Sequence, residues 1–216
     1  NGVPLFGKDH AQTKSLMSPI SVVDRLAGWR ERPLVACTIV AVAIAACAVS
    51  LIAAPGLAGF LGAALALIAL AIAVIDARWF IIPNELTAAG FALGLVYAAA
   101  TEPQALHAMF FAALRGAVLA LLFLGMREAY RRLRGRDGIG LGDVKLAGVA
   151  GAWLSWLAMP IAIEIAALAA IAVFAVRHYA AGRPLDATLK FPFGLFLAPS
   201  IWLGWLIDVM LLSVAN

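Results

Sequence analysis

Seven apolar segments dominate the sequence, each about long enough for one helical crossing of a membrane. They cover residues 34–54, 57–76, 86–101, 105–126, 143–158, 160–177 and 193–214. A membrane-spanning helix needs roughly 20 apolar residues, and lipid admits only structures that satisfy every backbone hydrogen bond internally. Because 64% of the 216 residues are hydrophobic and only 13% are charged, a water-soluble domain is excluded. We therefore expect an all-α, polytopic transmembrane bundle of about seven spans.

The basic residues indicate how this bundle is oriented. With a cytoplasmic N-terminus, the cytoplasmic stretches are 1–33, 77–85, 127–142 and 178–192, and they hold most of the Lys and Arg. The opposite loops, at 55–56, 102–104 and 159, hold none. This asymmetry follows the positive-inside rule and predicts a multi-pass protein of the inner (plasma) membrane. The net charge of +4 then belongs to loops that face anionic lipid, and no nucleic-acid partner is expected.

A polar segment precedes the apolar spans. Residues 1–33 are the only long polar stretch of the chain. Within them, residues 19–33 mix apolar and charged side chains at a spacing that fits a short amphipathic helix on the membrane surface. We expect a polar N-terminal segment, 1–33, followed by one membrane-embedded domain, 34–216.

Two aspartates stand at the edges of apolar spans, where ionisable groups are costly and therefore indicate function. Asp76 ends the second segment and Asp143 opens the fifth, which places both carboxylates at the cytoplasmic membrane face. One ionised and one protonated aspartate suit aspartic-type hydrolysis, because close like charges share a proton. From the residues alone, two unrelated helix-end aspartates are an equal alternative.

Local structure distinguishes the two aspartates. A helix dipole disfavours negative charge at the C-terminal end, where Asp76 stands, and favours it at the N-terminal end, where Asp143 stands. We therefore expect the negative charge of the pair to rest mainly on Asp143. Gly138, Gly140 and Gly142 precede Asp143 and allow an extended substrate strand to approach closely.

Three motifs resemble those of the type IV prepilin peptidases, and they follow that family's order. Asp76 precedes the element Pro83-Asn84-Glu85-Leu86-Thr87, which is similar to the family's first catalytic motif. The stretch 140–146 resembles the GxGDxK motif, and the stretch 192–198 resembles a late Pro-Phe-Gly-x-Phe-Leu-Ala element. A lone GxGD is shared with presenilin-like proteases. The three motifs together, over about residues 57–210, are specific to the prepilin peptidases.

The resemblance implies a GxGD-class aspartic endopeptidase. It would remove the leader peptide from prepilin or pseudopilin precursors after a Gly at the cytoplasmic membrane face, with Asp76 and Asp143 as the catalytic pair. The motifs assign no chemistry to the other matching residues, which we expect to bind substrate or shape the site: Pro83, Asn84, Gly140, Gly142, Lys145 and Gly194. For Lys145, pairing with Asp143 or with a lipid phosphate is as plausible as no role. We expect no metal and no cofactor, and the expected partners are the precursor and membrane lipid.

One departure from the family concerns a second activity. Many bacterial members carry a cytoplasmic domain with paired CxxC motifs that is associated with N-methylation. Here only Pro55-Gly56 separates the first two apolar segments, and Cys37 and Cys47 form no CxxC pair. The sequence therefore resembles the short form without the methyltransferase domain.

Arg115 and Glu164 are two further ionisable residues inside apolar segments, and we expect them to form a structural ion pair. The alternative function is an ion- or proton-coupled transporter that uses these residues together with the aspartates. The lack of an obvious inverted repeat weighs against a transporter. A scaffold protein and a presenilin-like protease are further alternatives. The intact aspartates argue against a scaffold that has lost its activity, and the Pro83-Asn84 motif argues against a presenilin-like protease.

Overall fold

The computed structural model describes residues 33–135, 138–181 and 192–215. The chain divides into two units, residues 1–37 and 38–216. The amphipathic helix predicted within residues 19–33 lies, apart from Pro33, outside the described residues. The architecture and the sites described below belong to the second unit.

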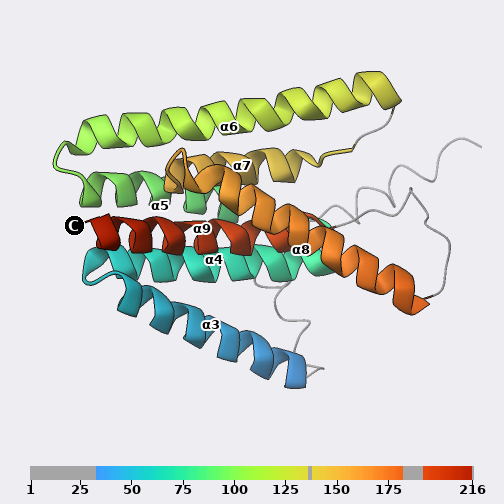
Figure 1. Ribbon diagram of the computed structural model, residues 1–216, viewed down its shortest axis with the longest axis horizontal. Coiled ribbons are helices and arrows are strands. Elements are labelled where there is room, and N and C mark those ends of the chain that lie inside the picture. The colour runs from blue at the N-terminus through green and yellow to red at the C-terminus, as the bar shows by residue number, and fades with distance from the viewer. Residues whose placement is uncertain (1–32, 136–137, 182–191, 216) are drawn as a thin grey trace, which may run out of the picture. The chain divides into compact units, whose positions relative to one another are not determined.

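Helices make up all the regular secondary structure of the described residues (Figure 1). They are α3 (Pro33–Ala53), α4 (Leu57–Trp79), α5 (Asn84–Thr101), α6 (Ala105–Arg134), α7 (Leu141–Trp153), α8 (Ala158–Ala181) and α9 (Gly194–Ala215). The predicted all-α polytopic bundle is confirmed. By length and composition, α3, α4, α6, α8 and α9 each suffice to cross a membrane.

Two helices end at places that the apolar pattern did not predict. α6 has 30 residues and continues through the arginine-rich stretch that was expected to be a loop. α7 has 13 residues and ends at Trp153, although the apolar segment continues to residue 158. The chain breaks there because the Ser155 hydroxyl accepts the Ala158 N–H at 3.1 Å and so caps α8. Pro160 lies in the first turn of α8, where its missing N–H costs nothing.

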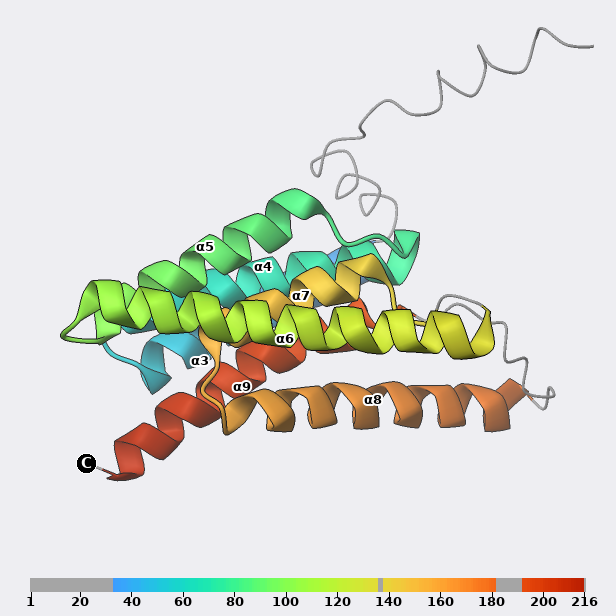
Figure 2. The ribbon, with the colours of Figure 1, turned by 90° about the horizontal axis from the view of Figure 1, so that it is seen from above.

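The helices pack in two neighbouring groups (Figures 1 and 2). α7 lies against α5 and α6, and α9 lies between α4 and α8. Small residues permit the closest approaches. A Cβ atom at Gly62 of α4 would overlap the Trp205 ring of α9, and one at Gly151 of α7 would lie 2.5 Å from the Arg115 carbonyl oxygen of α6. These contacts fix the position of each helix along the axis of its neighbour. They therefore also fix which polar residues of neighbouring helices lie close together.

Candidate active site

Asp76 is a buried residue in the last turn of α4, 5% exposed to solvent. Phe80 ends the helix in the left-handed conformation, with φ of 53°, and its N–H donates to the Asp76 carbonyl oxygen at 3.0 Å. The Asp76 carboxylate oxygen Oδ2 accepts a hydrogen bond from the Leu195 N–H at 2.9 Å. Because Leu195 is the second residue of α9, the N-terminal end of another helix binds this carboxylate.

Asp143 is half-buried in the first turn of α7. Its Oδ2 accepts the N–H of Gly140, the residue before the helix, at 3.2 Å, so the carboxylate caps its own helix. The loop before it is fixed from α6, where Arg127 Nη1 donates to the Ile139 carbonyl oxygen at 3.0 Å. The glycine-containing approach to Asp143 therefore has a defined conformation.

Ile82 joins the surroundings of the two aspartates. A Cβ atom at Gly142 would lie 3.0 Å from Ile82 Cβ, and one at Gly194 would lie 2.7 Å from Ile82 Cδ1 and 2.9 Å from Asp76 Oδ2. Since both glycines contact one side chain, the end of α4 meets the starts of α7 and α9 at this point. Gly142 directly precedes Asp143, and Gly194 lies against the Asp76 carboxylate, so both aspartates belong to this junction. The structure thus brings both predicted aspartates, Gly142 and Gly194 to one end of the bundle, here called the aspartate end.

The Pro83-Asn84 element lies at the same end. Pro83 is buried directly before α5, and the Thr87 hydroxyl donates to the Asn84 carbonyl oxygen at 3.0 Å, which closes the first turn. Lys145 Nζ donates to Asn84 Oδ1 at 2.5 Å. This partner is neither of the two weighed for Lys145 from the sequence. The bond joins the first turns of α5 and α7 beside the aspartates.

Besides the Lys145–Asn84 bond, three contacts at this end were not anticipated from the sequence. They are the Leu195 N–H on Asp76, the Ile82 side chain between the two glycines, and the Arg127 bond to Ile139. The Leu195 contact also removes the basis for assigning the negative charge to Asp143. That expectation considered only the helix that carries each aspartate, whereas Asp76 lies at the favourable end of α9 as well.

The predicted ion pair between Arg115 and Glu164 is wrong. Arg115 Nε donates to the Gly151 carbonyl oxygen at 3.3 Å, while Glu164 is exposed on α8. The carbonyl groups of the last helical turn lack partners within their own helix. Because α7 ends beside the middle of α6, Arg115 supplies a donor to one of its last carbonyls.

The arrangement at the aspartate end suits proton transfer to and from water and a carbonyl group. Among residues 33–135, 138–181 and 192–215, no group of three or more His, Cys, Asp or Glu side chains is placed to hold a metal ion. The fold and the site together define a polytopic membrane protein with a paired-carboxylate site.

The comparison with protein families is decisive for the class. The chain matches the sequence model of the type IV leader peptidase family over residues 63–175, more than half of its length and including both aspartates. It therefore belongs to the type IV leader peptidase family, as the three motifs predicted.

Curated relatives are similar to this chain in sequence. The prepilin leader peptidase/N-methyltransferase of Burkholderia pseudomallei strain 1026b is 37% identical over 131 residues, which are 60% of this chain and 40% of the relative. The protein of the same name from Dickeya chrysanthemi is 35% identical over 158 residues, 72% of this chain and 53% of the relative. The leader peptidase HopD of Salmonella typhimurium is 31% identical over 139 residues, 63% of this chain and 86% of the relative. The chain thus spans about half the length of the first two relatives. No solved structure matches it.

Proposed function

We propose that this chain is an aspartic endopeptidase of the inner (plasma) membrane that removes the leader peptide from prepilin or pseudopilin precursors, cutting after a Gly. The observation that carries the proposal is the meeting of Asp76 and Asp143 at one end of the bundle, each with one carboxylate oxygen bound by a backbone N–H. Membership of the type IV leader peptidase family and the names of the relatives support it.

The proposed mechanism uses one proton shared by the two carboxyl groups. The ionised carboxylate accepts a proton from water, and the water oxygen attacks the scissile carbonyl carbon. The protonated carboxyl donates its proton to the carbonyl oxygen, which gives a tetrahedral diol. When the diol collapses, the carboxyl group that took the proton from water gives it to the leaving amine and the C–N bond breaks. A diol hydroxyl returns its proton to the other carboxylate, so the pair again holds one proton. The Leu195 and Gly140 N–H groups bind the Oδ2 atoms, which holds each carboxyl group in place for water and substrate.

Charge distribution supports a cytoplasmic position for the aspartate end. Arg78 lies in the last turn of α4, and the last turn of α6 carries Arg131, Arg132 and Arg134. The connections at the other end, residues 54–56 and 102–104, contain no Lys or Arg. By the positive-inside rule, the aspartate end faces the cytoplasm, which agrees with a cytoplasmic N-terminus.

Exposed apolar side chains beside the aspartates support a substrate that arrives from the bilayer. Phe80 and Ile81 follow Asp76, Leu141 precedes Asp143, and all three are exposed. Such side chains suit contact with an apolar helix. In the proposed complex, the precursor helix approaches sideways and unwinds near its Gly, which presents the scissile bond to the carboxyl pair.

Cleavage of a co-expressed prepilin tests the function and the aspartate pair together. We expect the wild-type chain to remove a leader-sized mass and the Asp76→Asn and Asp143→Asn variants to remove none. Glu164→Gln is the matched control, because this carboxylate is exposed on α8, away from the aspartate end. Membrane insertion and thermal unfolding of each variant show whether it is folded.

Two results would contradict the proposal. A folded wild-type chain that cleaves no prepilin from several pilus classes would remove the function. Near-wild-type cleavage by either Asn variant would remove the carboxyl pair. Nothing in the comparisons supports the transporter alternative, which predicts that Glu164→Gln is defective as well.

A further inference from the structure

A cavity lies at the end of the bundle opposite the aspartates, and it exists because α7 is short. The 13 residues of α7 span about 20 Å, so α7 ends while α5, α6 and α9 continue. Gly151 of α7 contacts the backbone of Arg115. Arg115 is the eleventh residue of α6 and lies about 15 Å from the start of that helix. The chain turns at residues 154–157 and returns as α8. The space beyond the turn is a cavity of about 830 Å³, here called the Arg115 cavity.

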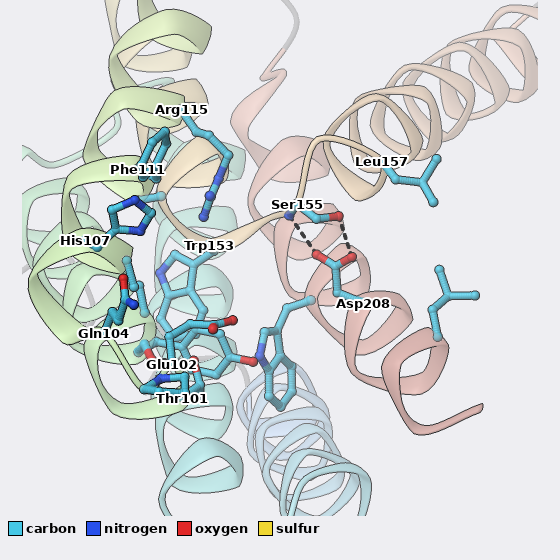
Figure 3. Close-up of a pocket in the computed structure, with 17 residues that line it drawn as sticks. Thr101, Glu102, Gln104, His107, Phe111, Arg115, Trp153, Ser155, Leu157 and Asp208 are labelled. Carbon is cyan, nitrogen blue, oxygen red and sulfur yellow. Dashed lines mark hydrogen bonds between the residues drawn. The ribbon is translucent and has the colours of Figure 1, made fainter. Parts of the chain in front are cut away.

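The backbone of the turn is satisfied by side chains that line this cavity. Irregular backbone at membrane depth is stable only where protein or water meets its polar groups. Asp208 of α9 accepts the Ser155 N–H at 2.8 Å and the Ser155 hydroxyl at 2.6 Å. Figure 3 shows these two bonds on the wall of the cavity. Both oxygens of the Asp208 carboxylate therefore accept hydrogen bonds from Ser155 in the turn.

Arg115 brings a permanent positive charge into the cavity (Figure 3). Its Nε donates to the Gly151 carbonyl oxygen, and within the described part of the chain no hydrogen bond or ion pair engages its Nη1 and Nη2 groups. An arginine at this depth is costly without an anionic partner. The guanidinium fork fits two oxygens of one phosphate or carboxylate group. Within the described residues, the Nη groups of Arg115 are therefore available in the cavity to bind an anionic group of a ligand.

The cavity also contains groups for a cation and for an apolar chain. Glu102, at the connection between α5 and α6, and Asp208 line the cavity together with Arg115, so two carboxylates accompany one arginine. Leu157 and Leu211 line the cavity as well and are 64% and 48% exposed, so its apolar wall continues into the outer surface of the helices. A matching ligand has a negative group, a positive group and an apolar tail.

We propose that the Arg115 cavity binds a zwitterionic aminophospholipid from the leaflet at this end of the bundle. The headgroup phosphate binds the Nη groups of Arg115, the ammonium group lies near Glu102, and the acyl chains pass along Leu157 and Leu211. A purely anionic lipid fits less well, because the two carboxylates outnumber the arginine. The site is separate from the carboxyl pair and does not depend on the proposed peptidase activity.

Native mass spectrometry of the purified, delipidated chain tests this site. Phosphatidylethanolamine, phosphatidylcholine and phosphatidylglycerol are titrated separately, and we expect phosphatidylethanolamine to bind most tightly, at one molecule per chain. Arg115→Gln is expected to weaken that binding at least ~10-fold, the effect of losing hydrogen bonds to a charged group. Arg134→Gln is the matched control, since it removes the same charge at the aspartate end and is expected to change nothing.

A second variant covers the case in which Arg115→Gln does not fold. Glu102→Gln changes an exposed residue, and it is expected to lose the preference for phosphatidylethanolamine over phosphatidylglycerol. Unchanged binding in Arg115→Gln, or unchanged preference in Glu102→Gln, would overturn the proposal. Equally tight binding of soluble glycerophosphoethanolamine would show that the cavity recognises a free phosphodiester, and this would overturn the assignment to lipid.

Discussion

Gly194→Ala is the substitution that most directly tests the geometry of the aspartate end. The added Cβ atom would lie 2.9 Å from Asp76 Oδ2 and 2.7 Å from Ile82 Cδ1. Ordinary contacts begin near 3.4 Å, so the Asp76 carboxylate must move by about 0.5 Å. Ile82 Cδ1 is the far end of a flexible, half-buried side chain, whereas Asp76 Oδ2 is held by the Leu195 N–H. The strain therefore falls mainly on the carboxylate.

The expected cost is larger for catalysis than for stability. Misplacing a reacting group by ~1 Å costs roughly 100-fold in rate, so a displacement of about half that size predicts a fall in kcat of ~10-fold. Overpacking costs ~1–3 kcal/mol, and the gain in helix propensity from Gly to Ala returns at most ~1 kcal/mol. We therefore expect a net destabilisation of ~0–2 kcal/mol.

Initial rates of prepilin cleavage in detergent, measured over a range of substrate concentrations, separate kcat from KM. Gly125→Ala is the matched control, because nothing lies within 4 Å of the Cβ atom it would add in α6. We expect it to keep wild-type kcat. If Gly194→Ala also kept wild-type kcat while binding substrate normally, the inferred contact between Gly194 and the Asp76 carboxylate would be refuted.

Two further predictions concern bonds between helices. Lys145→Met removes the hydrogen bond to Asn84 and should lower kcat several-fold, at a stability cost of only ~0.5–1.5 kcal/mol. Lys145→Arg should recover part of the activity. If the Met variant kept wild-type kcat, the bond would have no positioning role. Ser155→Ala removes the cap of α8 and one bond to Asp208 and should lower the free energy of unfolding by ~1–2 kcal/mol. Because Ser155 lies far from the aspartate end, cleavage by that variant should be unchanged, and an unaltered midpoint of thermal unfolding would contradict the assigned cap.

The sequence was sufficient to predict that Asp76 and Asp143 share one end of the bundle. Each aspartate stands beside a polar stretch, and alternating spans bring such stretches together at the same membrane face. The partner of Asp76 was not predictable in this way. Leu195 is 119 residues further along the chain, and helices that are apolar on every side do not indicate which neighbours they contact. The packing of small residues between two helices determines which helices are neighbours. This packing is a property of a pair of helices and cannot be predicted from one apolar segment alone.

The error at Arg115 has a different physical origin. Two opposite charges in separate spans suggested a pair, because each is costly alone in lipid. The prediction assumed that the apolar run through residue 158 is one continuous helix. Instead, α7 stops at Trp153, and a backbone carbonyl at mid-depth takes the donor that Glu164 was expected to receive. Hydropathy records how apolar a segment is, and it does not record where the segment turns.

In the proposed peptidase, the length of α6 sets the membrane depth at which the substrate is cut. Arg127 follows the first residue of this helix by 22 positions, a rise of about 33 Å, which matches the roughly 30 Å hydrocarbon thickness of a bilayer. Arg127 also holds Ile139, four residues before Asp143. The length of α6 therefore places the carboxyl pair at the boundary between the acyl chains and the headgroups. A precursor whose cleavage position lies one helical turn deeper in the membrane would place its peptide bond about 5 Å out of register and escape processing.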